Sequence, residues 1–336
     1  MTVAWLFPGQ GSQAVGMARD ILEASPAARA VFDRADAALA GAWVGDGSLS
    51  RLILEGPEEA LTLTANAQPA LVATSCAILE AIRELVPDAP SPVLAAGHSL
   101  GEYSALVAAG ALSLEDAVRL VRARGQSMQD AVPAGTGAMS AIMSVDPERL
   151  NALCAQAVEG FAGEVVAAAN YNAPGQIVVA GHTAAVARLG ELVAAEKGRA
   201  IALKVSAPFH CALMAPAARA LAGVLDRTPL AEGRFPVVAN FDARPNRDPA
   251  RTKELLVRQV DGAVRWDETI RLMAAQGVTH ALEIGPGKVL ANLVKRIAKE
   301  IKVLSVGDAA TLAQVPAFLS SCSSGASAAG RAEGAV

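Results

Sequence analysis

The chain lacks the cysteine patterns that build disulfide scaffolds or zinc sites. Its 336 residues include four cysteines, none in a C-x-x-C pair, and no histidine lies at a zinc-finger spacing from them. A disulfide-stapled fold is excluded at this length, and free thiols of a cytoplasmic protein are expected. We therefore expect no metal site. The cysteines are Cys76, Cys154, Cys211 and Cys322.

Positive charge and long apolar runs are also scarce. The formal net charge is −4 and no dense basic run occurs, which argues against non-specific nucleic-acid binding. No apolar run approaches the ~18 residues of a membrane span. The opening MTVAWLFPGQ has no basic segment before its apolar stretch, so we expect a first strand there and not a signal peptide. The expectation is a cytoplasmic protein without membrane or nucleic-acid partners.

Apolar residues are abundant, and they alternate between strand-like and helical patterns. They make up 52% of the chain against 18% charged residues, which implies a large buried core. The length suggests about two domains, or one α/β domain with an insertion. Strands alternating with helices predict a mostly parallel sheet covered on both faces. The predicted strands of this sheet are 3–7, 93–98, 235–240, 279–284 and 302–306.

The middle and the end of the chain break this pattern. Residues 137–205 read strand–helix–strand–strand–helix–strand, the ferredoxin-like order. The large domain would then comprise 1–136 and 206–312. Residues 313–336 form a terminal segment, which we expect to be disordered from about 320 because small residues dominate it. The predicted fold class is a large, mostly parallel, α/β hydrolase-like domain with an inserted small ferredoxin-like α+β subdomain.

The stretch GHSLGE places Ser99 in a Gly-x-Ser-x-Gly turn between a strand and a helix. Such a turn exposes one nucleophilic serine. The glycine-rich loop after the first strand fails the dinucleotide pattern, because Ala14 stands where a third glycine is required. Its glycines instead allow a backbone N–H to approach Ser99 and form an oxyanion hole with the amide of Leu100.

A serine needs a base, and the chain offers four histidines. His98 should point to the opposite side of the turn, His182 lies in the inserted segment, and His280 enters an apolar strand. His210 follows strand 200–205, which we take as the end of a large-domain strand, where open sheets build their sites. We therefore favour His210. No acid stands out to orient it, so a backbone or amide oxygen could take that role.

Helical spacing over 114–132 places Arg124 on the buried stripe. A guanidinium keeps its charge and is costly to bury without an anion. One interpretation is a salt bridge to a buried Asp or Glu. The other is a vacant cation that awaits a substrate carboxylate, held by two hydrogen bonds.

A set of motifs occurs in order along the chain: FPGQGSQ, ANAQPAL, GHSLGEYSAL, RARGQSMQ, NYNAPGQIVVAG, PFH and EIGPGKVL. In order and spacing this set resembles the malonyl-CoA:acyl carrier protein transacylases of bacterial fatty-acid and polyketide synthesis. The similarity runs from Val3 to about Val306. The resemblance implies a large α/β domain with a ferredoxin-like insertion. It also implies a ping-pong transfer of malonyl from malonyl-CoA to acyl carrier protein, without a cofactor, by what we expect to be a monomer.

The resemblance also assigns roles to single residues. It implies Ser99 as nucleophile, His210 as general base, and Gln10 and Leu100 as backbone donors of the oxyanion hole. By the same motifs Arg124 would bind the malonyl carboxylate, and the backbone oxygen of Gln259 in LLVRQV would orient the histidine.

Two features depart from the family pattern, and two other functions stay open. Phe209 precedes the histidine where many stand-alone bacterial members have Ser, and segment 320–336 has no counterpart. The first alternative is a serine thioesterase or hydrolase, which has no reason to keep a buried cation. The second is a catalytically silent scaffold that binds carrier protein.

Overall fold

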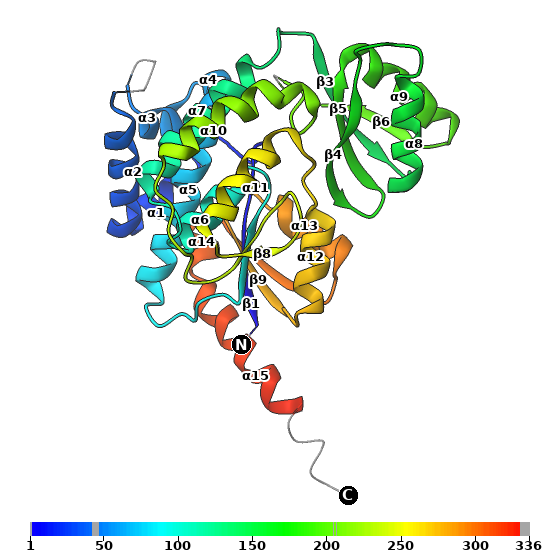
Figure 1. Cartoon of the computed structure of the whole chain (residues 1–336). Helices are drawn as coiled ribbons and strands as arrows, with labels where there is room; N and C mark the ends of the chain where they lie inside the picture. Colours follow the sequence, from blue (N-terminus) through cyan, green and yellow to red (C-terminus); the bar gives the residue numbers. More distant parts are fainter. Residues whose placement is uncertain (1, 42–46, 204, 206, 330–336) are drawn as a thin grey trace, which may run out of the picture.

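In this computed structural model, which describes residues 2–41, 47–203, 205 and 207–329, a six-stranded sheet lies at the centre of the large domain (Figure 1). Its strands are β1 (Val3–Phe7), β2 (Leu94–Gly97), β7 (Val237–Val238), β8 (Pro245–Asn246), β9 (His280–Ile284) and β10 (Lys302–Val306). Their order is β10-β9-β1-β2-β7-β8, and neighbours are parallel except β7 with β8. The predicted mostly parallel sheet is confirmed.

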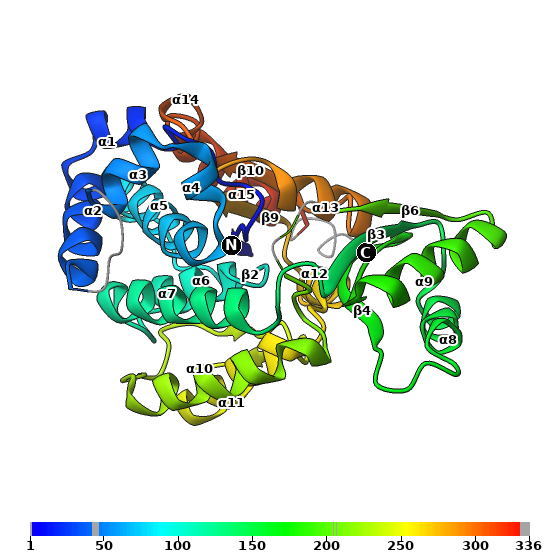
Figure 2. The same ribbon diagram turned by 90° about the horizontal axis from the view of Figure 1, so that it is seen from above.

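Helices cover both faces of this sheet (Figure 2). They are α1 (Arg19–Ala24), α2 (Pro26–Leu39), α3 (Leu49–Glu55), α4 (Glu58–Thr62), α5 (Thr64–Leu85), α6 (Gly101–Ala108), α7 (Leu114–Asp130), α10 (Ala215–Arg227, after the 3₁₀ turn Ala212–Met214), α11 (Pro249–Asp261), α12 (Trp266–Ala275) and α13 (Val289–Ile297). Side chains of β1 alternate between two apolar clusters. Trp5 and Phe7 share one with α2, α5 and α7, and Ala4 and Leu6 share the other with α12 and α13.

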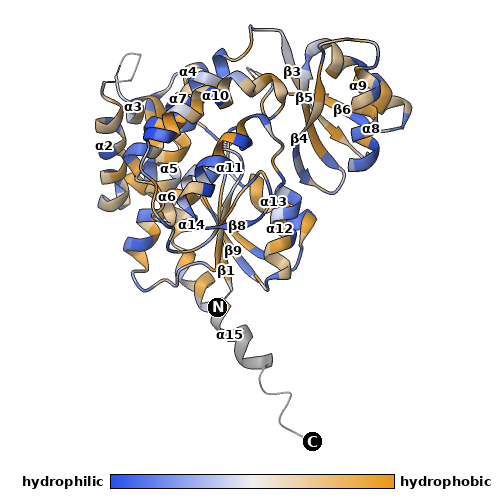
Figure 3. Ribbon diagram, in the orientation of Figure 1, coloured by the Kyte–Doolittle hydropathy of each residue, from blue (hydrophilic) through white to orange (hydrophobic). Residues whose placement is uncertain are grey.

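The helices begin where short polar side chains can cap them. Ser25 accepts a hydrogen bond from the backbone of Ala28 at the start of α2, and Ser113 accepts one from Asp116 at the start of α7. Each bond satisfies an N–H that has no partner inside the helix. Figure 3 shows how hydropathy is distributed over the fold, with apolar strands inside and polar residues on helices such as α7 and α11.

The segment after α7 builds a second, smaller sheet to one side of the large domain (Figure 1). Its elements are β3 (Gly137–Met143), α8 (Pro147–Ala157), β4 (Val166–Ala173), β5 (Gln176–His182), α9 (Thr183–Ala195) and β6 (Arg199–Ala202). Within the described residues the strand order is β4-β5-β3-β6, with all neighbours antiparallel. One face packs against α8 and α9, and the other contributes Met139 and Ala169 to the large core.

The C-terminal segment is helical further than we predicted. After α14 (Ala309–Leu312), helix α15 spans Val315–Ala329, past residue 320 where disorder was expected. Alanine favours helix, and Val315, Leu319 and Cys322 lie one helical turn apart and are buried. Residues 330–336 of the expected tail lie outside the described residues. No helix within the described ranges has the length and hydrophobicity to span a membrane.

Three backbone segments meet at the Gly-x-Ser-x-Gly turn. A Cβ atom on Gly97 would lie 1.8 Å from the carbonyl carbon of Gly101, and one on Gly101 would lie 2.0 Å from the backbone oxygen of Phe7. Both glycines are therefore required because β1, β2 and α6 approach too closely for any side chain.

The Gly101→Ala variant should unfold at markedly lower denaturant concentration, with a free energy of unfolding about 3 kcal/mol lower, because β1 must move away from α6. Gly223→Ala is the matched control, since nothing lies within 4 Å of its added Cβ in α10. That control should raise the stability by about 0.5–1 kcal/mol. Equal urea midpoints for Gly101→Ala and the wild type would contradict the close approach.

Candidate active site

Ser99 follows β2 at the carboxyl end of the large sheet, in a turn held by Asn240. Its φ of 49° lies in the left-handed region, which is strained for a serine. The Ser99 N–H donates to Oδ1 of Asn240 at 2.6 Å, and Nδ2 of Asn240 donates to the backbone oxygen of Gly97 at 2.7 Å. Asn240 follows β7, the neighbour of β2. The strained turn is thus fixed from the adjacent strand.

His210 lies directly beside the serine. Its Nε2 is 2.7 Å from Oγ of Ser99, and its Nδ1 is 2.7 Å from the backbone oxygen of Gln259. A carbonyl oxygen only accepts, so Nδ1 carries the proton and Nε2 is free to accept one from the serine. Of the alternatives left open by the sequence, the group that orients His210 is a backbone oxygen.

The strand that precedes His210 does not belong to the large sheet, contrary to the prediction. The strand before it ends at Ala202 as β6, which pairs with β3 in the small sheet and not with the large one. His210 lies instead on the segment that returns from the small sheet to α10, with a φ of 61°. The position at a large-sheet strand end was therefore a wrong reason for the choice.

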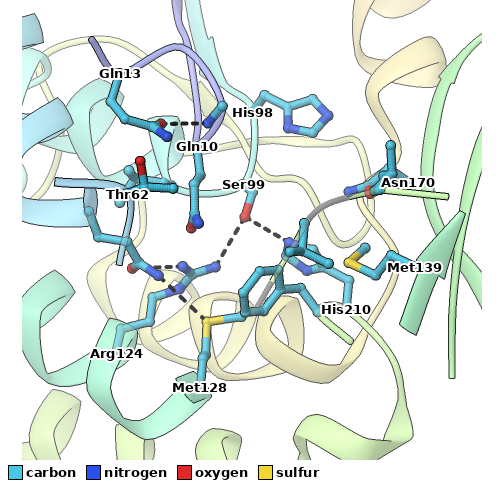
Figure 4. Close-up of a pocket in the computed structure, with 16 residues that line it drawn as sticks. Gln10, Gln13, Thr62, His98, Ser99, Arg124, Met128, Met139, Asn170 and His210 are labelled. Atoms are coloured by element: carbon cyan, nitrogen blue, oxygen red, sulfur yellow. Dashed lines mark hydrogen bonds between the residues drawn. The ribbon is translucent and has the colours of Figure 1, made fainter. Parts of the chain in front are cut away.

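The other three histidines have partners away from Ser99. The ring of His98 points away from the serine (Figure 4), and its Nε2 is 2.8 Å from Oδ1 of Asn172 in β4. His182 accepts the backbone N–H of Val165 at 3.0 Å. His280 packs its ring edge-on against Phe318 at 5.3 Å between centroids.

Arg124 is buried, with 2% of its surface exposed, and it points at the serine (Figure 4). One terminal nitrogen donates to Oε1 of Gln68 at 2.8 Å. The other donates to Oγ of Ser99 at 3.1 Å and to Oε1 of Gln259 at 3.0 Å. No carboxylate of the described residues forms an ion pair with it, so the interpretation as a structural salt bridge is wrong.

Close contact between α5 and α7 brings the arginine and Gln68 together. A Cβ atom on Gly125 would lie 2.7 Å from the backbone oxygen of Thr64 and 2.8 Å from Cα of Ala65. Glycine next to Arg124 therefore lets α7 pack against the first turn of α5, and α5 is the helix that carries Gln68. This explains the glycine in RARGQSMQ.

A cavity of about 200 Å³ opens above Ser99, between the two sheets. The large domain contributes Ser99, Arg124, His210 and both residues predicted for the oxyanion hole, Gln10 and Leu100. The backbone N–H groups of those two residues have no acceptor within the described part of the chain. Six further residues of the large domain line the cavity. The other five form a mostly apolar wall from the small sheet and the segment after it: Met139, Asn170, Leu203, Val205 and Phe209.

Comparison with known proteins identifies the family of this arrangement. Residues 4–319 match the acyl transferase domain. The chain belongs to the acyl transferase family. Over 312 residues it is 48% identical to the malonyl CoA-acyl carrier protein transacylase of Bacillus subtilis, covering 92% of this chain and 95% of that protein.

Solved structures agree with this family. An acyl carrier protein S-malonyltransferase from Vibrio cholerae superposes with a TM-score of 0.89 at 45% identity, covering 94% of this chain and 100% of the other. A malonyl-transacylase solved in complex with a type II PKS acyl-carrier protein gives 0.88 at 43% identity, covering 94% and 98%.

Burial sets the charge states of the acyl transferase site. It lowers the pKa of His210 to about 3, with a further contribution from the positive charge of Arg124. It raises the pKa of Glu102 to about 7, although hydrogen bonds from Asn240 and Gln259 oppose this. At neutral pH the imidazole of His210 is therefore an unprotonated base. Among the described residues no group of three or more His, Cys, Asp or Glu could hold a metal ion.

Three residues of the acyl transferase site were missed from the sequence. Gln68 and Glu102 lie inside the motifs ANAQPAL and GHSLGEYSAL, but nothing in their local pattern showed that they are buried. Asn240 ends the predicted strand 235–240, and a polar residue at the carboxyl end of a parallel strand is the signal that could have found it.

Replacing the base should separate the histidines of the acyl transferase. His210→Ala should slow acylation of Ser99 by about 10²- to 10⁴-fold, because it removes the base that is hydrogen-bonded to the serine hydroxyl. His98→Ala, the matched imidazole deletion in the same cavity, should slow it less than about tenfold. Rapid-quench acylation with circular dichroism as a folding check measures both. Equal losses in two folded variants would contradict the assignment of His210.

The lowered pKa of His210 predicts an unusual pH profile. With acetyl-CoA, whose acyl group has no carboxylate, acylation of Ser99 should change little between about pH 8 and about pH 5, since the base stays neutral above its pKa. A histidine of ordinary pKa ~6.5 would lose about thirtyfold at the acid end of that range. Such a loss in stopped-flow measurements would contradict the burial argument.

Proposed function

We propose that this acyl transferase moves the malonyl group from malonyl-CoA to the phosphopantetheine thiol of an acyl carrier protein, through a malonyl-Ser99 intermediate. The observation that carries the proposal is the guanidinium of Arg124, 3.1 Å from Oγ of Ser99 and without a carboxylate partner in the described residues. The names of the relatives, malonyl transacylases and a carrier-protein complex, support the same substrates.

The position of Arg124 suits malonyl in length and charge. One methylene separates the two carboxyl carbons of malonyl, so its free carboxylate stays close to an ester on Ser99. Arg124 has five N–H donors and uses three on Gln68, Gln259 and Ser99. After acylation the ester oxygen of Ser99 is a poor acceptor, and its donor can turn to the carboxylate. Acetyl offers no such group.

The first half-reaction charges the serine. Nε2 of His210 takes the proton of Ser99 as Oγ attacks the thioester carbonyl of malonyl-CoA. The backbone N–H groups of Gln10 and Leu100 stabilise the oxyanion. The tetrahedral intermediate collapses, the C–S bond breaks, and the imidazolium of His210 gives the proton to the departing thiolate of coenzyme A.

The second half-reaction repeats these steps with the carrier thiol. Nε2 of His210 takes the thiol proton, the sulfur attacks the malonyl ester, and Ser99 leaves with the proton. The backbone oxygen of Gln259 steadies the imidazolium in both halves, in place of an acid. These residues and the two substrates complete the reaction, so the proposal includes no cofactor.

The finer organisation of the chain is part of the proposal. The strand order β4-β5-β3-β6 with two helices on one face supports a ferredoxin-like subdomain over 137–205. The serine turn after a parallel strand supports a hydrolase-like large domain over 1–136 and 206–312. We propose that the protein acts as a monomer in the cytoplasm, where its four free cysteines stay reduced.

Intact-protein mass spectrometry after brief mixing with malonyl-CoA tests the function. A malonyl adduct that persists and then moves to added holo acyl carrier protein is the expected result, and Ser99→Ala should give none. Rapid loss of the adduct to water would favour a thioesterase. Absence of any adduct on the folded wild type would favour a silent scaffold.

Arg124→Ala should weaken transition-state binding in malonyl transfer by about 2–5 kcal/mol, because the substrate carboxylate loses its buried partner. This loss would appear as a lower kcat/KM. Acetyl transfer should stay the same or improve. Arg119→Ala, on the exposed side of the same helix and hydrogen-bonded to the backbone of Ala38, is the matched control and should change neither rate. Parallel losses for malonyl and acetyl would show that Arg124 is structural.

A further inference from the structure

Glu102, in the first turn of α6, is a buried carboxylate that the reaction steps do not use. Only 3% of its surface is exposed. Its Oε2 accepts the backbone N–H of Asn240 at 2.9 Å and Nε2 of Gln259 at 2.8 Å. No Lys, Arg or His within the described residues forms an ion pair with it. Burying a carboxylate without a cation costs desolvation free energy, which points to a role for Glu102 beyond packing.

The side chain of Gln259 links Glu102 to the groups around Ser99. Its Nε2 donates to Glu102 and also to the backbone oxygen of Ser99 at 3.0 Å. Its Oε1 accepts from Arg124 at 3.0 Å. One amide therefore lies between a buried anion and a buried cation, with its NH₂ end toward Glu102 and its oxygen toward Arg124.

We propose that Glu102 is a positioning residue: it fixes the orientation of the Gln259 side-chain amide and, through that amide, the guanidinium of Arg124. An ionised carboxylate only accepts hydrogen bonds, so the NH₂ end of the amide must face it. The reversed amide would place that NH₂ against the N–H donors of Arg124. The inference rests on the proposed malonyl transfer, in which Arg124 holds the substrate carboxylate.

A change at Glu102 should affect Arg124 but not His210. Gln259 reaches Arg124 through its side chain, but it reaches His210 through its backbone oxygen. A change at Glu102 can turn the amide without moving the backbone of α11. Removing the negative charge should therefore weaken selection of a carboxylated acyl group and leave the base in place.

The charge of Glu102 should also make this selection depend on pH. Burial raises the pKa of Glu102 to about 7, Arg124 from α7 lowers it, and Asp242 after β7 raises it. The other titratable groups at the site, among the described residues, are Tyr103, His210 and His98. The pKa values of Tyr103 and His210 are about 12 and about 3, so neither changes charge near neutrality, and burial lowers the pKa of His98, which favours its neutral form. Below its pKa Glu102 gains a donor and holds the amide less strongly, so that the orientation then depends on the backbone oxygen of Ser99 and on Arg124.

The test is Glu102→Gln, which keeps the shape and an acceptor for Asn240 but removes the charge. We expect kcat/KM for malonyl-CoA to fall about 10- to 100-fold, as for a lost hydrogen bond to a charged group, and that for acetyl-CoA to change less than about threefold. In the wild type the malonyl-to-acetyl ratio should fall from about pH 8 to about pH 6, and in the variant it should stay flat.

Glu283→Gln is the matched control, because Glu283 is also fully buried but holds the first backbone N–H groups of α13, Leu290 and Ala291. It should lower stability and leave the malonyl-to-acetyl ratio unchanged. If folded Glu102→Gln keeps the malonyl-to-acetyl ratio of the wild type, whether both rates fall equally or neither falls, the positioning role is overturned. If that variant does not fold, a wild-type ratio constant from about pH 8 to about pH 6 overturns it.

The same measurements separate this inference from the proposed function. A wild type that forms no lasting malonyl adduct refutes the transfer reaction and the inference with it. A wild type that transfers malonyl, together with a variant of unchanged ratio, refutes only the role of Glu102.

Discussion

The hydrogen bonds of one buried asparagine hold the reacting serine in place. Asn240 binds the backbone on both sides of the turn, through the N–H of Ser99 and the oxygen of Gly97. Its own N–H donates to Glu102, and its carbonyl accepts from Arg265 just before α12. A strained φ persists only where the surroundings over-determine it, and here the side chain and the backbone of one residue together join β2, β7 and α6 around it. The position of the nucleophile therefore depends on the pairing of β2 with β7.

Burial of one cation serves two purposes at this site. Arg124 has no carboxylate partner among the residues that the structure describes, which keeps it available for an anionic acyl group, and its charge adds to the burial that keeps His210 unprotonated. The same low-dielectric surroundings that make an unpaired guanidinium costly also strengthen its pull on a substrate carboxylate. Amide and hydroxyl oxygens from Gln68, Gln259 and Ser99 offset part of that cost.

The sequence predicted the features that depend on local patterns and missed those that depend on distant contacts. Alternating strands and helices foretold the parallel sheet, and helical spacing foretold a buried Arg124, because periodicity reports which face is covered. His210 was selected by elimination, with a wrong view of its strand. Glu102 could not be placed, because a polar residue in an apolar helix turn has no local mark of its partners. Asn240 carried a signal, its position at the carboxyl end of a predicted strand, but its partners are distant in the sequence. The helix beyond residue 320 was missed because composition outweighed the spacing of Val315, Leu319 and Cys322.

The cavity has its reactive side on the large domain and part of its opposite wall on the segment that leaves the small sheet. Ser99, Arg124 and their supports belong to the large domain, whereas Leu203 and Val205 follow β6, are exposed and belong to none of the apolar core clusters. A change of shape at those two residues places little strain on the fold that aligns the nucleophile. Substitutions in this wall can therefore change which acyl groups fit the cavity while the catalytic residues keep their positions. The shape of the acyl group accepted and the catalysis of its transfer are thus set by separate parts of the chain.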